Sequence, residues 1–279
     1  MIEPMAPAPQ VDGGVFDGVS ATTLWTLRNR ASEAKRSDGV IRDPWAITVF
    51  DAIAYDYAKF GRPHQVHALR ANAFDDPTAR YLAEHPRASV VALAEGLQTS
   101  FWRLTRNHAD AEFTWYSVDL PPVMDLRAKL LPTDDRIVGL AQSALDRSWL
   151  DRVDAGDGVF VTAEGLLMYL EPADVLALIA DCARRFPGGA MMFDSIPPWL
   201  RARTLRGLRL TRRYTAPPMP FALTADQGLA LAGGIPGVRR ARDITLPPGR
   251  GLFGTVPQRL LDRGVLHRLR PSIMLLEFG

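Results

Sequence analysis

The stretch VVALAEGLQTSFWRL, residues 90–104, decides the fold. Its first four residues are apolar and include two β-branched valines, as is typical of a buried strand. Gly96 ends that run, and the large apolar side chains that follow recur at helical spacing. We therefore expect a strand, a tight turn and a helix. The next apolar stretch, residues 113–122, predicts a second strand that ends at Asp119.

Gly96 and Asp119 together form a candidate nucleoside site. A glycine at a strand-to-helix turn lets the backbone approach a ligand, and an acid at the end of the next strand can accept hydrogen bonds from ribose hydroxyls. The three-glycine dinucleotide fingerprint is absent, because Ala94 and Glu95 fill the earlier glycine places. An NAD-dependent oxidoreductase therefore has little support. Gly96 alone is explained equally well by an ordinary turn.

The composition indicates a globular protein with a substantial core. The 279 residues suffice for one α/β domain with an appendage, and 47% of them are hydrophobic. Lys and Arg number 33 against 31 Asp and Glu, so the net charge of +2 does not favour nucleic acid as a partner. A single cysteine, Cys182, excludes an internal disulfide and a cysteine-based zinc cluster.

The N-terminal sequence MIEPMAPAPQ lacks the basic and apolar segments of a secretory signal. The chain also has no run of 18 apolar residues. We therefore expect a cytoplasmic protein with no membrane partner. No pattern in the sequence indicates the oligomeric state.

The chain divides into three regions. Residues 1–12 are rich in Pro and Ala, and we expect a disordered tail there. Residues 13–86 show helical periodicity and predict an N-terminal helical cap. Residues 87–279 alternate strands with helices, which predicts a Rossmann-like, doubly wound parallel sheet. Within this core, the alternation breaks at about residues 197–222, where we expect a lid insertion packed through Leu205 and Leu208.

Two Asp-Pro pairs predict helix starts within the N-terminal helical cap. Asp43-Pro44 begins one helix, and Asp76-Pro77 begins another that ends near His85. Each proline lacks an N–H, which costs nothing at the first helical position. The sequence thus predicts a break between the helical pattern at residues 67–73 and the helix after Pro77.

Acidic side chains end two of the expected strands. Glu164 follows the strand at residues 159–161, and Asp194 follows the strand at residues 191–193. Ligands in open α/β sheets bind at this carboxyl edge, so both acids are candidate ligand contacts. Capping of the following helix is the alternative role for each.

Basic and imidazole side chains of the cap are further candidates. Arg30 and Arg70 can pair with a ligand carboxylate or remain solvated. His64 and His67 have the spacing of metal ligands, but no third ligand is close in sequence, so we expect no metal site.

Five stretches occur in the order in which the leucine carboxyl methyltransferase family has them, and the chain resembles that family. The family includes enzymes that methylate protein C-terminal carboxylates and a bacterial branch that methylates small molecules such as polyketides. The stretches are TLWTLRNRASEAKRSDGVIRDPWA (23–46), LRANAFDD (69–76), VVALAEGLQTSFWRL (90–104), WYSVDLPPVMDLRAKLL (115–131) and VFVTAEGLLMYLEPADV (159–175).

The resemblance implies a class I methyltransferase fold, which is a Rossmann-like seven-stranded sheet with an antiparallel last strand. It also implies that the protein binds S-adenosyl-L-methionine (SAM) and releases S-adenosyl-L-homocysteine (SAH). It implies roles for residues at matching positions: basic groups for the cofactor's carboxylate, a glycine turn, a ribose acid and an adenine-binding pair. These residues are Arg30, Arg70, Gly96, Asp119, Leu120, Ser143, Ala144 and Glu164.

The sequence departs from the family pattern in three places, at five residues. Ala94 and Glu95 replace Gly-Ala, Gln98 replaces an Asp, and Ser143-Ala144 replaces the Asp-Leu that reads adenine. Glu95 can bind the cofactor's ammonium group or repel its carboxylate. These changes motivate a second hypothesis, a catalytically silent protein that binds SAM or another ligand.

The favoured hypothesis is a SAM-dependent O-methyltransferase that acts on a carboxylate or hydroxyl of a small molecule. A carboxylate acceptor needs no base, whereas a hydroxyl acceptor does. The candidate bases are His64, His67 and Tyr214.

Overall fold

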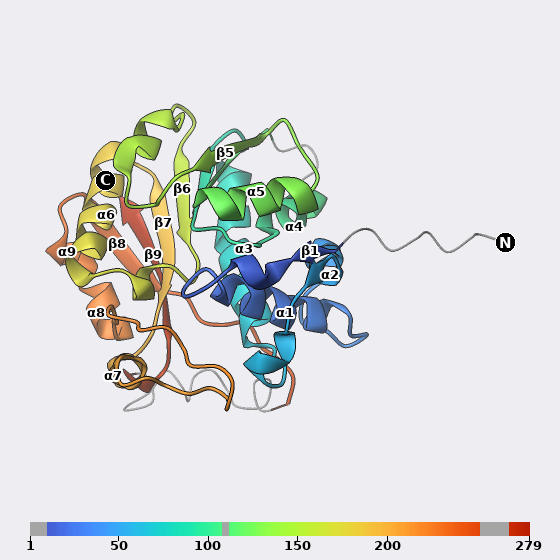
Figure 1. The fold of residues 1–279 in the computed structure, drawn as a ribbon. Coiled ribbons are helices and arrows are strands. Elements are labelled where there is room, and N and C mark those ends of the chain that lie inside the picture. The colour runs from blue at the N-terminus through green and yellow to red at the C-terminus, as the bar shows by residue number, and fades with distance from the viewer. Residues whose placement is uncertain (1–9, 108–111, 252–267) are drawn as a thin grey trace.

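A seven-stranded sheet forms the centre of the protein (Figure 1). The structure is a computed structural model that describes residues 10–107, 112–251 and 268–279. The strand order is β5-β4-β3-β6-β7-β9-β8. The strands are β3 (Ser89–Leu93), β4 (Thr114–Asp119), β5 (Ile137–Ala141), β6 (Val159–Ala163), β7 (Ala190–Ser195), β8 (Val238–Asp243) and β9 (Ser272–Phe278).

The topology confirms the predicted doubly wound sheet with an antiparallel last strand. β3 pairs in parallel with β4 on one side and with β6 on the other. β4 in turn pairs in parallel with β5, and β6 pairs in parallel with β7. β9 lies antiparallel between β7 and β8. Chain order reverses between β3 and β6, and this is where ligands bind in open α/β sheets.

Helices cover both faces of the sheet, as Figure 1 shows. On one face, Leu82 and Phe101 pack against Val90 and Trp115. On the other, Ile179 packs in the cluster that holds the opposite side chains of the strands. The first face carries α3 (Val66–Glu84), α4 (Ser100–Asn107) and α5 (Pro121–Leu130); the second carries η3 (Arg147–Arg152), α6 (Pro172–Arg185), α8 (Ala225–Leu229) and α9 (Leu231–Gly234).

The N-terminal cap packs against the carboxyl edge of the sheet. It contains η1 (Gly13–Val15), α1 (Thr22–Ala34), α2 (Pro44–Asp51) and η2 (Tyr57–Phe60). Leu24 and Val49 of this cap share a buried cluster with Leu97 and Leu126 of the core. The predicted start of α2 is confirmed, because the Asp43 carboxylate accepts a hydrogen bond from the Ala46 N–H at 2.9 Å.

The predicted disordered tail extends too far. β1 (Val11–Asp12) pairs in parallel with β2 (Ile53–Ala54), so these two residues of the tail are ordered by the cap. Residues 1–9 lie outside the described part of the chain.

The predicted helix start at Asp76-Pro77 is wrong. Pro77 lies inside the single helix α3. A proline in a helix interior costs about 3 kcal/mol or more. Burial on both sides of it offsets this cost, since Phe74 packs against the sheet before Pro77 and Leu82 packs against it afterwards. The helix therefore passes from the cap into the core without a break.

The region at residues 197–222 begins with α7 (Pro198–Leu205) and then turns back on itself, with an isolated antiparallel bridge between Arg209 and Thr215. This region contacts the cap, because Thr211 Oγ1 donates to the Lys59 carbonyl at 2.6 Å. The prediction that Leu205 packs inward is wrong, since its side chain is 48% exposed. Over the described residues, no helix is long and apolar enough to cross a membrane.

Candidate active site

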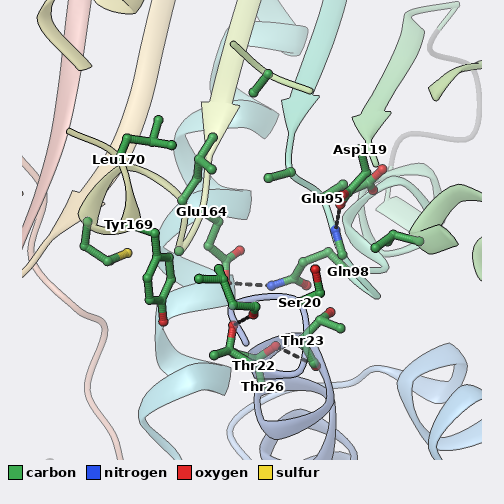
Figure 2. A pocket seen from close by; sticks show the side chains of 18 of the residues that line it. Ser20, Thr22, Thr23, Thr26, Glu95, Gln98, Asp119, Glu164, Tyr169 and Leu170 are labelled. Atoms are coloured by element: carbon green, nitrogen blue, oxygen red, sulfur yellow. Dashed lines mark hydrogen bonds between the residues drawn. The ribbon is translucent and has the colours of Figure 1, made fainter. Parts of the chain in front are cut away.

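A cavity of about 390 Å³ lies at the carboxyl edge of the sheet, between the strand ends and the cap (Figure 2). This volume is in the usual range for small-molecule sites. Its walls come from the start of α1, the turn after β3, and the segments after β4, β5 and β6. Of the residues singled out in the sequence, those lining it are His67, Arg70, Ala94, Glu95, Gly96, Gln98, Asp119, Leu120, Ser143, Ala144 and Glu164.

The glycine turn and the acid after β4 are joined directly. Asp119 Oδ2 accepts a hydrogen bond from the Gly96 N–H at 2.6 Å, and Oδ1 accepts from the Leu120 N–H at 2.7 Å. Burial raises the pKa of Asp119, and the two backbone donors oppose that shift. Each oxygen keeps a further lone pair, so both can still accept from a diol.

The turn at Gly96 tolerates no side chain. Its φ is +58°, in the left-handed region. A Cβ there would lie 2.4 Å from Thr23 Oγ1 of the cap. The same hydroxyl accepts from the Leu97 N–H at 2.8 Å, so α1 closes directly over the turn.

The Glu95 carboxylate is already engaged by buried hydrogen-bond donors of the protein. Its Oε2 pairs with Arg127 Nη2 at 2.8 Å, and the Ser117 hydroxyl donates to the same oxygen. Trp115 Nε1 donates to Oε1 at 3.2 Å. Because these buried donors engage both oxygens, Glu95 is not available to bind an ammonium group.

Arg127, which sequence reasoning missed, holds the shape of the turn. Its Nη1 donates to the carbonyl oxygens of Gly96 and Gln98 at 2.7 and 2.9 Å. The side chain is 5% exposed. The Glu95 substitution thus comes with a buried cation that neutralises it and binds the adjacent backbone.

Arg70 lies between two acids on the cavity wall. Its Nε donates to Glu164 Oε1 at 2.9 Å, and its Nη1 donates to Asp194 Oδ2 at 3.0 Å. Both acids end strands as predicted, and Asp194 Oδ1 also accepts from the Gly165 N–H at 2.6 Å. Burial raises the pKa of Glu164, while the neighbouring Arg70 lowers it. Arg70 is held as a cation by the two carboxylates, which raise its pKa.

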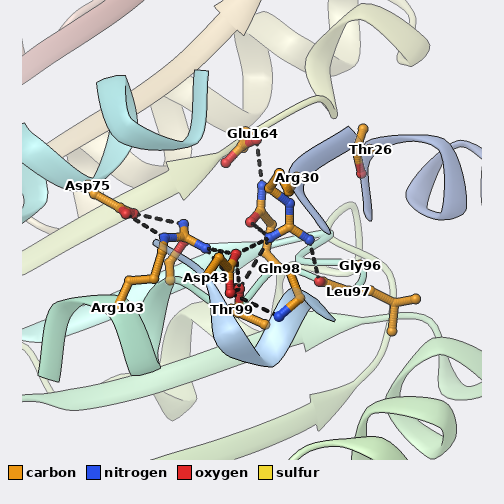
Figure 3. Close-up of polar contacts among 12 residues, drawn as sticks. Thr26, Arg30, Asp43, Asp75, Gly96, Leu97, Gln98, Thr99, Arg103 and Glu164 are labelled. Atoms are coloured by element: carbon orange, nitrogen blue, oxygen red, sulfur yellow. Dashed lines mark hydrogen bonds and ion pairs between the residues drawn. The ribbon is translucent and has the colours of Figure 1, made fainter. Parts of the chain in front are cut away.

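Arg30 does not line the cavity, and Figure 3 shows its polar contacts. Its Nη2 donates to the Leu97 carbonyl at 2.6 Å, and its Nη1 donates to Gln98 Oε1 at 2.5 Å. Nη1 also pairs with Asp43 at 3.2 Å. These contacts tie the cap to the glycine turn, and the predicted contact of Arg30 with a ligand carboxylate stays a prediction.

Gln98 connects this buried group to the cavity. Its Nε2 donates to Glu164 Oε1 at 2.6 Å, as Figures 2 and 3 show. An aspartate here would repel Glu164, whereas the amide accepts from Arg30 and donates to the acid. The substitution therefore supports the site instead of closing it.

The three candidate bases differ in whether they line the cavity. Tyr214 packs against Trp25 and Phe60 in the cap, away from the cavity lining. Its buried hydroxyl has a pKa raised by desolvation. His64 is also outside the lining, and only His67 reaches the cavity wall.

The start of α1 contributes cavity residues that the sequence analysis did not identify. Hydroxyl side chains gather there at the mouth of the cavity (Figure 2). The available signal was the density of Ser and Thr on both sides of Trp25. They are Ser20, Thr22, Thr23 and Thr26.

The predicted adenine-binding pair lies in a tight turn after β5. Ser143 Oγ accepts from the Leu145 N–H at 3.1 Å, and the Ala144 carbonyl accepts from Trp149 Nε1 at 3.1 Å. The hydroxyl proton of Ser143 is left to donate to a ligand.

A family model of leucine carboxyl methyltransferases matches residues 23–183. The chain belongs to this family. The match covers most of the cap, the glycine turn, Asp119 and Glu164, and therefore most of the cavity lining. The lining residues outside it are Val19, Ser20, Thr22, Ile196, Leu200 and Met219. Members of the family are SAM-dependent methyltransferases.

Relatives agree with this membership. The tetracenomycin polyketide synthesis O-methyltransferase TcmP of Streptomyces glaucescens is 32% identical over 225 residues, which is 80% of this chain and 81% of TcmP. A Saccharopolyspora erythraea protein described as a SAM-dependent methyltransferase is 30% identical over 204 residues, or 65% of this chain and 69% of its own length.

Solved structures show the same fold at low identity. A Thermobifida fusca protein described as a methyltransferase is 17% identical, with a TM-score of 0.54 over 90% of this chain and 94% of its own. The SAM-dependent methyltransferase SibL in its apo form is 16% identical, with a TM-score of 0.51 over 94% and 70% of the two chains. The class I methyltransferase fold predicted from the sequence is thus confirmed.

Proposed function

We propose that this methyltransferase transfers the methyl group of SAM to an oxygen of a small molecule, either a carboxylate or a hydroxyl, and releases SAH. The observation that carries the proposal is the composition of a single cavity. Its lining combines charged groups suited to an amino-acid nucleoside with a second set of side chains that is mainly apolar.

The charged groups of the lining fit the cofactor. Asp119 would accept from the ribose hydroxyls. Nη2 of Arg70, for which the described residues provide no acceptor, would bind the methionyl carboxylate. Glu164 Oε2, for which the described residues likewise provide no donor, would accept from the ammonium group. When bound, SAM supplies an electrophilic methyl carbon on its sulfonium centre.

The apolar side chains of the lining fit an apolar acceptor. Side chains from the cap, from the segment after β6 and from the region after β7 form this part of the wall, and TcmP provides a relative named for polyketide synthesis. These residues are Trp25, Met168, Leu170, Ile196, Leu200 and Met219.

Little covalent chemistry is required of the protein. The acceptor oxygen must lie in line with the bond that breaks, and water must be excluded while it does so. The apolar wall excludes water, and the cap fixes the acceptor relative to the charged groups. A hydroxyl acceptor would require a base, and His67 is the one base candidate from the sequence that reaches the wall.

Calorimetric titration with SAM and SAH tests the proposal. Wild-type protein should bind both at micromolar concentration. Asp119→Ala should weaken binding about 10- to 100-fold, because it removes charged hydrogen-bond acceptors. Asp125→Ala is the matched control, since Asp125 is an exposed acid on α5 outside the cavity lining.

Absence of binding to folded wild-type protein would refute the proposal. The silent-binder hypothesis makes a different prediction, namely tight SAM binding without conversion of SAM to SAH when an aromatic carboxylate or phenol is supplied as acceptor. A thermal melt of each variant separates lost binding from lost folding.

A further inference from the structure

His67 has a fixed position on the cavity wall. It lies three residues before Arg70 on α3, so the two side chains share a helix face about one turn apart. Its ring meets the Trp25 ring edge-on, with centroids 5.0 Å apart. Its Nδ1 lies 2.7 Å from Asn29 Nδ2 of α1.

The orientation of the Asn29 amide determines which ring nitrogen of His67 carries the proton. Asn29 is fully buried, and its Oδ1 lies 3.4 Å from the His64 backbone nitrogen, whose N–H can only donate. Oδ1 must therefore face His64, which leaves Nδ2 facing His67. An amide nitrogen also only donates, so His67 Nδ1 accepts and the proton of the neutral ring lies on Nε2.

The surroundings keep the ring neutral. Burial lowers the pKa of His67 well below its usual value, and the nearby cations Arg70 and Arg30 and the neighbouring His64 lower it further. Arg70 and Arg30 belong to α3 and α1, the helices on either side of the ring, while His64 precedes α3. Nε2 has no hydrogen-bond acceptor among the described residues.

We propose that His67 presents a fixed Nε2–H donor to the cavity, binds an anionic oxygen of the methyl acceptor and positions it for transfer. His67 is then an acceptor-binding residue and not a general base. The inference rests on the proposed function. It implies that the acceptor arrives ionised, as a carboxylate or an acidic enol or phenol, because the nitrogen that meets it has no lone pair to offer.

Nitrogen-15 NMR of histidine-labelled protein tests the protonation state directly. Free and SAH-loaded protein should both show His67 as the neutral Nε2–H form between about pH 6 and 8. An Nδ1–H form, or an imidazolium at neutral pH, would overturn the proposal. Because the free protein suffices for this measurement, its result is independent of whether SAH binds.

Binding of 2-naphthoate to SAH-loaded protein tests the donor role. Wild type and His67→Gln, which retains an N–H donor, should bind this anion, and His67→Ala should bind it about tenfold more weakly. A wild type that binds 2-naphthoate no better than His67→Ala would overturn the proposal. Asp125→Ala again serves as the matched control.

Asn29→Asp provides a readout that a purely structural role would not give. The carboxylate would accept a proton from Nδ1, so the pKa of His67 would rise. Below that pKa the imidazolium still donates from Nε2, whereas above it Nε2 carries a lone pair. Binding of 2-naphthoate to this variant should therefore fall as the pH rises, while wild type stays constant between about pH 6 and 8. Parallel profiles for the two proteins would overturn the proposal.

Discussion

Arg127→Met removes the buried cation beneath the glycine turn. The substitution deletes the 2.8 Å ion pair with Glu95 and the hydrogen bonds to the Gly96 and Gln98 carbonyls. Methionine retains an apolar stem of similar length, so packing is largely kept. Removing one partner of a buried ion pair costs about 3–5 kcal/mol. We expect the free energy of unfolding to fall by that amount.

The pH dependence of this loss identifies its cause. Burial already raises the pKa of Glu95, and removing Arg127 raises it further. A carboxyl group whose folded pKa exceeds its unfolded value favours folding when protonated, and this contribution is lost as the pH rises through the folded pKa. The variant should therefore approach wild type in stability as the pH falls toward the unfolded pKa of glutamate, about 4.3.

Glu95→Gln in the Arg127→Met background provides the control. The neutral amide carries no charge to desolvate, so we expect it to recover about 1–3 kcal/mol and to abolish this pH dependence. Urea unfolding followed by tryptophan fluorescence at several pH values measures each quantity. A loss below about 1 kcal/mol, or the same loss with Glu and Gln at position 95, would refute the reasoning.

Two further predictions concern single side chains. Ala94 has a φ of +48°, which costs a non-glycine residue about 1–2 kcal/mol. Ala94→Gly should therefore raise the free energy of unfolding by about 0.5–1 kcal/mol, after allowing for the added entropy of the unfolded chain. A lower free energy of unfolding in urea for this variant would contradict the prediction. Cys182 is buried on α6, and burial raises the pKa of its thiol to about 12. A disulfide reagent should therefore label this thiol only as fast as the protein opens. Rapid labelling of the native protein would contradict this prediction.

The sheet and the polar half of the cavity were predictable because local patterns specify them. Apolar runs that end in Asp119 and Glu164 identify strands and also place both acids at the carboxyl edge. Parallel strands expose that edge together, so the sequence order of these residues is enough to bring them into one site. Gly96 is fixed in the same way, by a turn that requires a positive φ.

The remaining features depend on contacts between distant residues. The sequence led us to expect that Glu95 meets the cofactor, whereas its partner is Arg127, on the helix that follows the next strand. No local pattern shows that Arg30 contacts Leu97 and Gln98. Pro77 was read as a helix start by a rule of local chemistry, and burial on the sheet overrides that rule.

The uninterrupted course of α3 has a mechanical consequence. His67 and Arg70 lie near one end of this rod, and Leu82 anchors its other end against the sheet. A hinge between cap and core would have to bend this helix. The helix therefore fixes the distance from the charged groups of the cavity to its apolar wall. Sequence change at α1 and at residues 197–222 can therefore alter which acceptor fits while the reach to the cofactor stays constant.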